Sequence, residues 1–196
     1  MGTGTAIAVT FAIILAIGLM VGLTVMAMYN GLVDKDVEIE NKWAKVETGY
    51  QRRADLIPSL VATVKKYAEH EEETFVKVAE ARSAAANAKT PSEMQKADGA
   101  IKEALKSLFM VVEAYPELKA SEHFLTLQSQ LEGTENRIKY ERDEYNNAVT
   151  LYKKSVRSFP TGIIANMFGF NADKWEMFKS AAGSENAPDV ADLFGE

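Results

Sequence analysis

The first 33 residues contain no charged side chain, and all 22 basic and 28 acidic residues follow Val33. Within this stretch, residues 6–29 form an unbroken run of apolar or small side chains. As a helix this run is about 36 Å long, enough to cross a hydrocarbon core of ~30 Å. Because only a helix satisfies its own backbone hydrogen bonds in lipid, the run predicts a transmembrane anchor over residues 1–30.

The alternative interpretation of this run is a cleaved signal peptide, because Val25, Met26 and Ala27 include the small residues that a signal peptidase prefers. Residues 1–5 contain no Lys or Arg, however, and the apolar run exceeds the usual ~7–15 residue core of a signal peptide. We therefore favour a retained anchor. Myristoylation of Gly2 is not expected, since Ala6 stands where Ser or Thr is needed.

The rest of the chain has the size and charge of one acidic soluble domain. The net charge is −6, which argues against nucleic-acid binding because nucleic-acid binders normally carry a basic excess. The chain has no cysteine, so it has neither disulfides nor a thiolate metal site.

Apolar residues then recur every three or four positions, as in long amphipathic helices. One series runs from Ile39 to Tyr67 with Pro58 inside it, where the helix should bend or lose a hydrogen bond. The series continues to Ala85, and its pattern alone does not place a turn within residues 69–74.

Two further helices have clearer boundaries. Thr90 to Glu93 is a capping box with Pro at the first helical position, and that helix should stop before Pro116. The last long helix should begin near Ser121 and end at Phe159. Short connections make sequential helices antiparallel neighbours. The fold class predicted is therefore all-α, with the anchor followed by an antiparallel up-and-down bundle of four helices over residues 31–160.

Small residues spaced along the anchor are candidates for helix association in the membrane, although ordinary membrane-helix composition also produces such spacing. They are Ala8, Ala12, Ala16, Gly18 and Gly22.

Residues 161–178 are too apolar for a solvated tail, and residues 179–196 again end in apolar side chains. Three interpretations stand for the first segment: packing on its own bundle, contact with a neighbouring subunit, or insertion at the membrane surface with Lys153, Lys154 and Arg157 near anionic headgroups. A subunit contact is one interpretation of the tail. The candidate contact residues are Ile164, Met167, Phe168, Phe170, Trp175, Phe178, Leu193 and Phe194.

Charged residues within the apolar stripes are candidates for buried ion pairs, since a buried charge needs a partner. They are Arg53, Glu113, Glu135 and Arg142. We expect Arg53 to pair with Glu135 or Glu113, and we expect the role to be structural. His70 and His123 lie in polar surroundings without metal-ligand spacing, and no nucleophile or phosphate-loop motif is present. We therefore expect no enzyme activity, cofactor or metal.

Several stretches resemble the bacterial LemA family in order, from residue 29 to residue 178. They are residues 29–33, 50–61, 64–71, 81–83, 113–120, 135–138, 145–149 and 159–170 together with Trp43. Ser59 and Lys153 depart from the pattern, where Asn is expected, and the tail after Phe178 lies outside it. The resemblance implies an anchor followed by a four-helix bundle with a turn near residues 69–74. It implies no established enzymatic activity, and a related branch is associated with magnetosome membranes.

The function expected is a non-enzymatic scaffold that self-assembles into a homo-oligomer, which can be large, and organises or remodels the bacterial membrane. The expected location is the inner membrane, which the chain crosses once. The alternative is a small-oligomer adaptor whose bundle docks another envelope protein. The lipid bilayer is an expected partner and nucleic acid is not; no specific protein partner is identified. Lys35, Lys42 and Lys45 follow the anchor and no basic residue precedes it, which favours a cytoplasmic body over a periplasmic or extracellular one.

Overall fold

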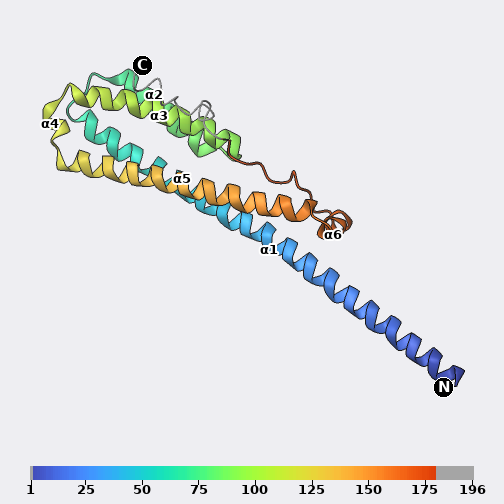
Figure 1. The fold of residues 1–196 in the computed structure, drawn as a ribbon. Coiled ribbons are helices and arrows are strands. Elements are labelled where there is room, and N and C mark those ends of the chain that lie inside the picture. Colours follow the sequence, from blue (N-terminus) through green and yellow to red (C-terminus); the bar gives the residue numbers. More distant parts are fainter. Residues whose placement is uncertain (1, 180–196) are drawn as a thin grey trace, which may run out of the picture. The chain divides into compact units, whose positions relative to one another are not determined.

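The computed structural model describes residues 2–179, without the side chains of Thr5 and Ala6. Over these residues the regular structure is entirely helical, as the sequence predicts, and contains no strand (Figure 1). The helices are α1 (Thr3–Lys65), α2 (Glu72–Asn87), α3 (Pro91–Glu113), α4 (Pro116–Lys119), α5 (Glu122–Arg157) and α6 (Thr161–Phe168).

Helix α1 is continuous over 63 residues, so the predicted anchor and the amphipathic series that begins at Ile39 belong to one helix. Pro58 lies inside α1 without ending it. The break between α1 and α2 covers residues 66–71, which confirms the turn that the family resemblance implied and moves it a few residues towards the N-terminus.

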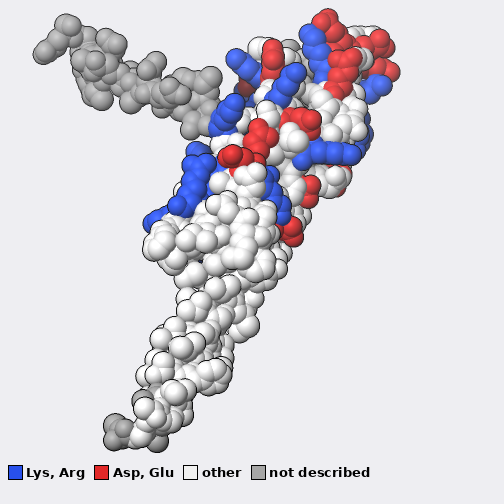
Figure 2. Space-filling model, turned by 90° about the vertical axis from the view of Figure 1, so that its right-hand side faces the viewer, with Lys and Arg blue, Asp and Glu red and all other residues white. Residues whose placement is uncertain are grey.

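The N-terminal part of α1 is long and apolar enough to cross a membrane. Its most apolar window has a mean hydropathy of 2.5, and none of that window is buried by other parts of the described structure. In Figure 2 this part of the helix shows neither acidic nor basic side chains. Length and composition therefore make it a candidate membrane span.

The predicted capping box is confirmed at the start of α3. The Glu93 backbone N–H donates to Thr90 Oγ1 at 3.2 Å, and Glu93 Oε2 accepts from the backbone N–H groups of Lys89 and Thr90 at 2.9 and 3.2 Å. These backbone hydrogen bonds lower the pKa of Glu93 below its ordinary value. Helix α3 ends at Glu113, two residues before the predicted end, and α4 begins at Pro116.

The described residues form two compact units, and two of the three boundaries between them, after Tyr50 and after Gly133, fall inside long helices. Unit 1 comprises residues up to Tyr50 with Thr134–Trp175, and unit 2 comprises Gln51–Gly133 with the described residues after Trp175. The division into domains at residues 30, 160 and 178 stays a prediction.

Unit 2 has a hydrophobic core to which α1, α2, α3, α4 and α5 all contribute. Phe109 and Phe124 meet edge to face with ring centroids 6.2 Å apart. Removing such side chains from water stabilises a fold by ~25 cal/mol per Å² of apolar surface. The core residues include Ile57, Leu60, Val64, Val78, Ile101, Leu105, Leu108, Val112, Leu118, Phe124, Leu127 and Leu131.

Unit 1 is built from α1 and the second part of α5, which lie side by side (Figure 1). Trp43 lies against Tyr145 with ring centroids 5.4 Å apart, and Lys42 Nζ donates to Glu144 Oε2 at 2.6 Å. That hydrogen bond raises the pKa of Lys42. A Cβ added to Gly49 would lie 2.9 Å from Ile138 Cγ1, so glycine permits a close approach of the two helices there.

Candidate functional site

The most distinctive feature of unit 1 is the short helix α6 and the reversal of the chain after it. Gly169 follows α6 with a φ of +80°, a left-handed conformation that glycine adopts without a Cβ clash. The Phe170 backbone N–H then donates to the Ala165 carbonyl at 2.9 Å. This cap turns the chain back beside α6 and brings Phe170 close to Phe168.

Both phenylalanines contact Tyr29, the last residue of the apolar run on α1. The Tyr29 ring centroid lies 4.9 Å from that of Phe168 and 5.7 Å from that of Phe170. Aromatic pairs at such separations are favourable by ~0.5–1.5 kcal/mol beyond the area they bury. The contacts place α6 beside the end of the candidate membrane span.

A polar contact with α1 holds the segment after Phe170. Asp36 accepts hydrogen bonds from Lys174 Nζ at 2.6 Å and from Trp175 Nε1 at 2.8 Å. Asp36 lies two helical turns beyond Tyr29 on α1. Residues 168–175 are thus attached to α1 at an aromatic contact and at a charged one.

Helix α6 buries one side and exposes the other. Ile164 and Ala165 are buried, whereas Ile163 and Met167, one turn apart, are exposed by 57% and 65%. Phe168 is exposed by 51%, and Phe159, just before α6, by 86%. We call Phe159, Ile163, Met167 and Phe168 the apolar platform. Its exposure shows that packing within unit 1 accounts for only one side of this segment.

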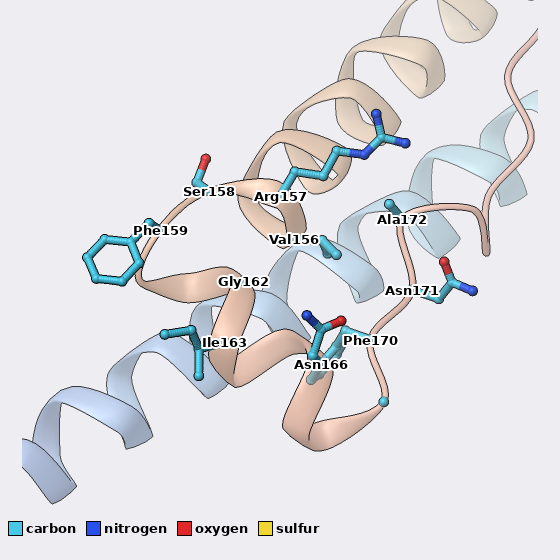
Figure 3. A pocket seen from close by; sticks show the side chains of 11 residues that line it. Val156, Arg157, Ser158, Phe159, Gly162, Ile163, Asn166, Phe170, Asn171 and Ala172 are labelled. Carbon is cyan, nitrogen blue, oxygen red and sulfur yellow. The ribbon is translucent and has the colours of Figure 1, made fainter.

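A pocket of about 730 Å³ lies beside the platform, between the end of α5, α6 and residues 169–172 (Figure 3). Its lining is mixed, with Val156 and Phe170 next to Arg157, Asn166 and Asn171. Arg157 Nη2 lies 3.6 Å from Asp173 Oδ1, and both side chains are largely exposed. The pocket is therefore open to water and offers hydrogen-bond donors beside apolar surface.

The remaining predicted contact residues divide between buried and peripheral positions. Trp175 and Phe170 are half-buried in unit 1, and Phe178 is buried in unit 2. Next to Phe178, Gln95 exchanges two hydrogen bonds with the Lys179 backbone, which holds this part of the chain on α3. Ile164 and Phe178 thus pack within the described part of the protein, and their contact with a partner stays a prediction. Leu193, Phe194 and the segment 180–196 lie outside the described residues.

The small residues of the anchor are exposed on α1. A Cβ added to Gly18 or Gly22 would meet no atom within 4 Å, so packing within the described structure does not require glycine at either position. Their role in helix association stays a prediction, as does that of the three alanines.

Arg53 forms a buried ion pair, but with a partner that the sequence analysis did not name. Arg53 Nη1 donates to Asp98 Oδ1 on α3, and Lys102 Nζ lies 2.9 Å from Asp98 Oδ2. Glu113 instead pairs with Lys119 at 2.5 Å, and it lies about 22 Å along α3 from Asp98, beyond the reach of Arg53. The predicted Arg53–Glu113 pair is therefore wrong.

The other predicted ion-pair residues, Glu135 and Arg142, stay candidates. A buried charge that the sequence analysis missed is Glu141, whose Oε1 accepts a hydrogen bond from Arg137 Nε at 3.2 Å.

Within residues 2–179, no group of three or more His, Cys, Asp or Glu side chains is arranged to hold a metal ion. His70 and His123 are both exposed, each near a helix terminus. The arrangement in unit 1 is instead suited to contact with an apolar surface.

Comparison with known proteins gives one family. A family model described as the LemA family matches residues 42–191. It begins later than the resemblance at residue 29 and extends past Phe178, so the expectation that the tail lies outside the family pattern is wrong.

Individual relatives agree with the family match. Magnetosome protein MamQ 2 of Paramagnetospirillum magneticum is 24% identical over 184 residues, covering 81% of this chain and 68% of the relative. Protein LemA of Metamycoplasma hominis is 27% identical over 140 residues, covering 69% and 63%. Magnetosome protein MamQ of Magnetospirillum gryphiswaldense is 23% identical over 173 residues, covering 75% and 64%.

Proposed function

The chain belongs to the LemA family, and from this premise we propose that it is a non-enzymatic, membrane-anchored scaffold that self-associates and organises or remodels the bacterial membrane. The observation that carries the proposal is the uncovered apolar surface of α1. Apolar side chains at successive positions round the helix, from Ile7 to Met26, are exposed by more than half. Such a surface is stable only against lipid or against other helices.

The arrangement of unit 1 supports a helical bundle beyond the anchor. Lys42 pairs with Glu144, and Gly49, further along α1, approaches Ile138, which lies earlier on α5. As the residue numbers rise along α1, those of the residues it contacts on α5 fall, which is the pattern of two antiparallel helices. We infer that α1, α2, α3 and α5 together form an antiparallel bundle of four helices.

Self-association is supported by the anchor itself. Ala8, Ala12, Ala16, Gly18 and Gly22 give α1 small side chains through which a second membrane helix can approach closely. The names of two relatives refer to magnetosomes, which are membrane compartments, and this supports a role in organising membrane. On the positive-inside rule, Lys35, Lys42 and Lys45 favour a cytoplasmic body over a periplasmic or extracellular one.

The test is the particle size of the detergent-extracted full chain, measured by light scattering and by electron microscopy of the same fraction. A Gly18→Leu, Gly22→Leu variant fills the proposed association face. The matched control is Ile17→Leu with Val21→Leu, which has the same spacing on another face of the same turns and keeps the helix apolar.

Closed particles of many subunits that shrink in the glycine variant and persist in the control would support the scaffold. A monodisperse species of one or a few subunits would overturn it. That second result would favour the alternative function, an adaptor whose bundle docks another envelope protein, and a stoichiometric partner should then co-purify with the full chain.

A further inference from the structure

We propose that the apolar platform inserts into the headgroup region of the same bilayer that α1 crosses, so that unit 1 binds phospholipid at a second place besides its anchor. The proposal rests on the membrane-anchor part of the proposed function. It assigns lipid contact to Phe159, Ile163, Met167 and Phe168, which neither the family match nor the relatives' names assign.

The first argument is depth. The apolar run of α1 ends at Tyr29, so a membrane that covers the run has its headgroup region near this residue. The ring of Phe168 lies 4.9 Å from that of Tyr29. Tyrosine and tryptophan concentrate at this level in membrane proteins because their rings are amphipathic. Phe168, and α6 with it, therefore lies at headgroup depth and not out in the solvent.

The second argument is that apolar side chains are exposed on the side of α6 that faces away from unit 1. Ile163 and Met167 stand one turn apart on this side, and the buried Ile164 and Ala165 fix the rotation of the helix. Phe159 and Ile163 also line the pocket, at the other end of it from Asn171 and Ala172 (Figure 3). Burying an exposed phenylalanine or methionine contributes ~1.5–3 kcal/mol, which makes water an unfavourable environment for the platform.

The third argument is charge beside the platform. Lys154 and Arg157 are exposed on the last turn of α5, and Lys153 is half-exposed next to them. Each basic residue near an anionic bilayer surface contributes ~1 kcal/mol of attraction. Among the carboxylates of this region, Asp36 is bound to Lys174 and Trp175 and Asp173 faces Arg157 at 3.6 Å, while Asp34 is exposed beside Lys35 on α1.

The pocket beside the platform fits the same environment. It combines Arg157, Asn166 and Asn171 with Val156 and Phe170. A site of this character at headgroup depth can donate hydrogen bonds to phosphate or ester oxygens while its apolar walls meet the upper acyl chain. Attachment at both α1 and the platform would also fix the rotation of unit 1 about the α1 axis, which a single helix does not.

The experiment measures depth with nitroxide spin labels on the full chain in vesicles of phosphatidylcholine and phosphatidylglycerol. The chain has no cysteine, so one introduced cysteine is labelled uniquely. Phe159→Cys and Met167→Cys test the platform. Leu19→Cys, 67% exposed, reports the anchor. Tyr140→Cys, 60% exposed and about 26 Å along α5 from its last residue, Arg157, is the water-side control. Collision with oxygen, which partitions into lipid, is compared with collision with a water-soluble nickel complex.

The platform labels should show an oxygen-to-nickel collision ratio several-fold above that at Tyr140 and below that at Leu19. Ratios at Phe159 and Met167 equal to that at Tyr140, with Leu19 deep, would overturn the platform while leaving the anchor intact. A Leu19 label exposed to nickel would instead refute the anchor, and the platform with it. If the platform labels were shielded from both reagents and their spectra were broadened by a second spin label, the platform would contact another copy of the chain. That result would also overturn lipid insertion.

Discussion

Replacing Asp98 by alanine is expected to be the most destabilising single truncation of a charged residue in unit 2. The side chains of Arg53 and Asp98 are exposed by only 4% and 5%, so the Asp98→Ala variant removes the Asp98 carboxylate from a buried guanidinium. Breaking a buried pair from one side costs ~3–5 kcal/mol. In a unit of this size each kcal/mol shifts the melting temperature by ~4–8 °C, so the midpoint should fall by more than ~10 °C.

The assay is thermal unfolding of the detergent-extracted full chain, followed by far-UV circular dichroism. Both tryptophans, Trp43 and Trp175, belong to unit 1, so their fluorescence shows whether that unit is unchanged. Lys102→Gln is the matched control, because Lys102 also contacts Asp98 but is 50% exposed and should cost little.

A double variant separates the loss of the Arg53–Asp98 pair from the cost of keeping the Arg53 charge buried without Asp98. Arg53→Met with Asp98→Leu replaces both charges by apolar groups of similar volume, and replacement of this kind is often neutral or stabilising. The double variant should therefore recover most of the stability that Asp98→Ala loses. An Asp98→Ala midpoint close to that of the Lys102→Gln control would refute the reasoning.

Two further predictions concern a helix contact and a helix cap. Gly49→Ala should be less stable than Gly31→Ala on the same helix by ~1–3 kcal/mol in thermal unfolding, because only the first adds a Cβ 2.9 Å from Ile138; equal stabilities would contradict this. The pKa of Glu93 is lowered from 4.5 by backbone hydrogen bonds, so its contribution to the cap is present above pH 4.5 and lost as the pH falls through the lower folded-state pKa. A carbon-13 titration of the Glu93 carboxyl checks the sign, and a midpoint at or above 4.5 would contradict it.

Local signals in the sequence predicted the helix boundaries well where the chemistry is local. The capping box at Thr90 and Glu93 depends on residues three apart, and it forms as predicted. The continuity of α1 was harder to predict, since the anchor and the amphipathic series have different patterns. Pro58 costs the helix one hydrogen bond, but the buried neighbours Ile57 and Leu60 keep packing on both sides of it.

Asp98 could have been recognised from the sequence as a candidate partner of Arg53. Asp98 lies four residues after Met94 and three before Ile101, both on the apolar stripe of α3, so it shares their face. The same reasoning identifies Glu141, which is three residues after Ile138 and four before Tyr145. A charged residue on the apolar stripe of a helix is therefore a candidate for a buried ion pair in every helix of this chain. Which two such residues pair depends on the register between the helices, which the sequence does not give.

The site in unit 1 depends on contacts between distant parts of the chain, and this is why the sequence left three interpretations of residues 161–178 open. Tyr29 and Phe168 are far apart in sequence, and their contact shows that α6 lies beside the end of the apolar run. Ile164 is buried and Met167 is exposed, so one side of α6 packs on unit 1 and the other side stays uncovered. Packing on the protein's own unit positions α6, and that position leaves the opposite side of the helix available to the membrane.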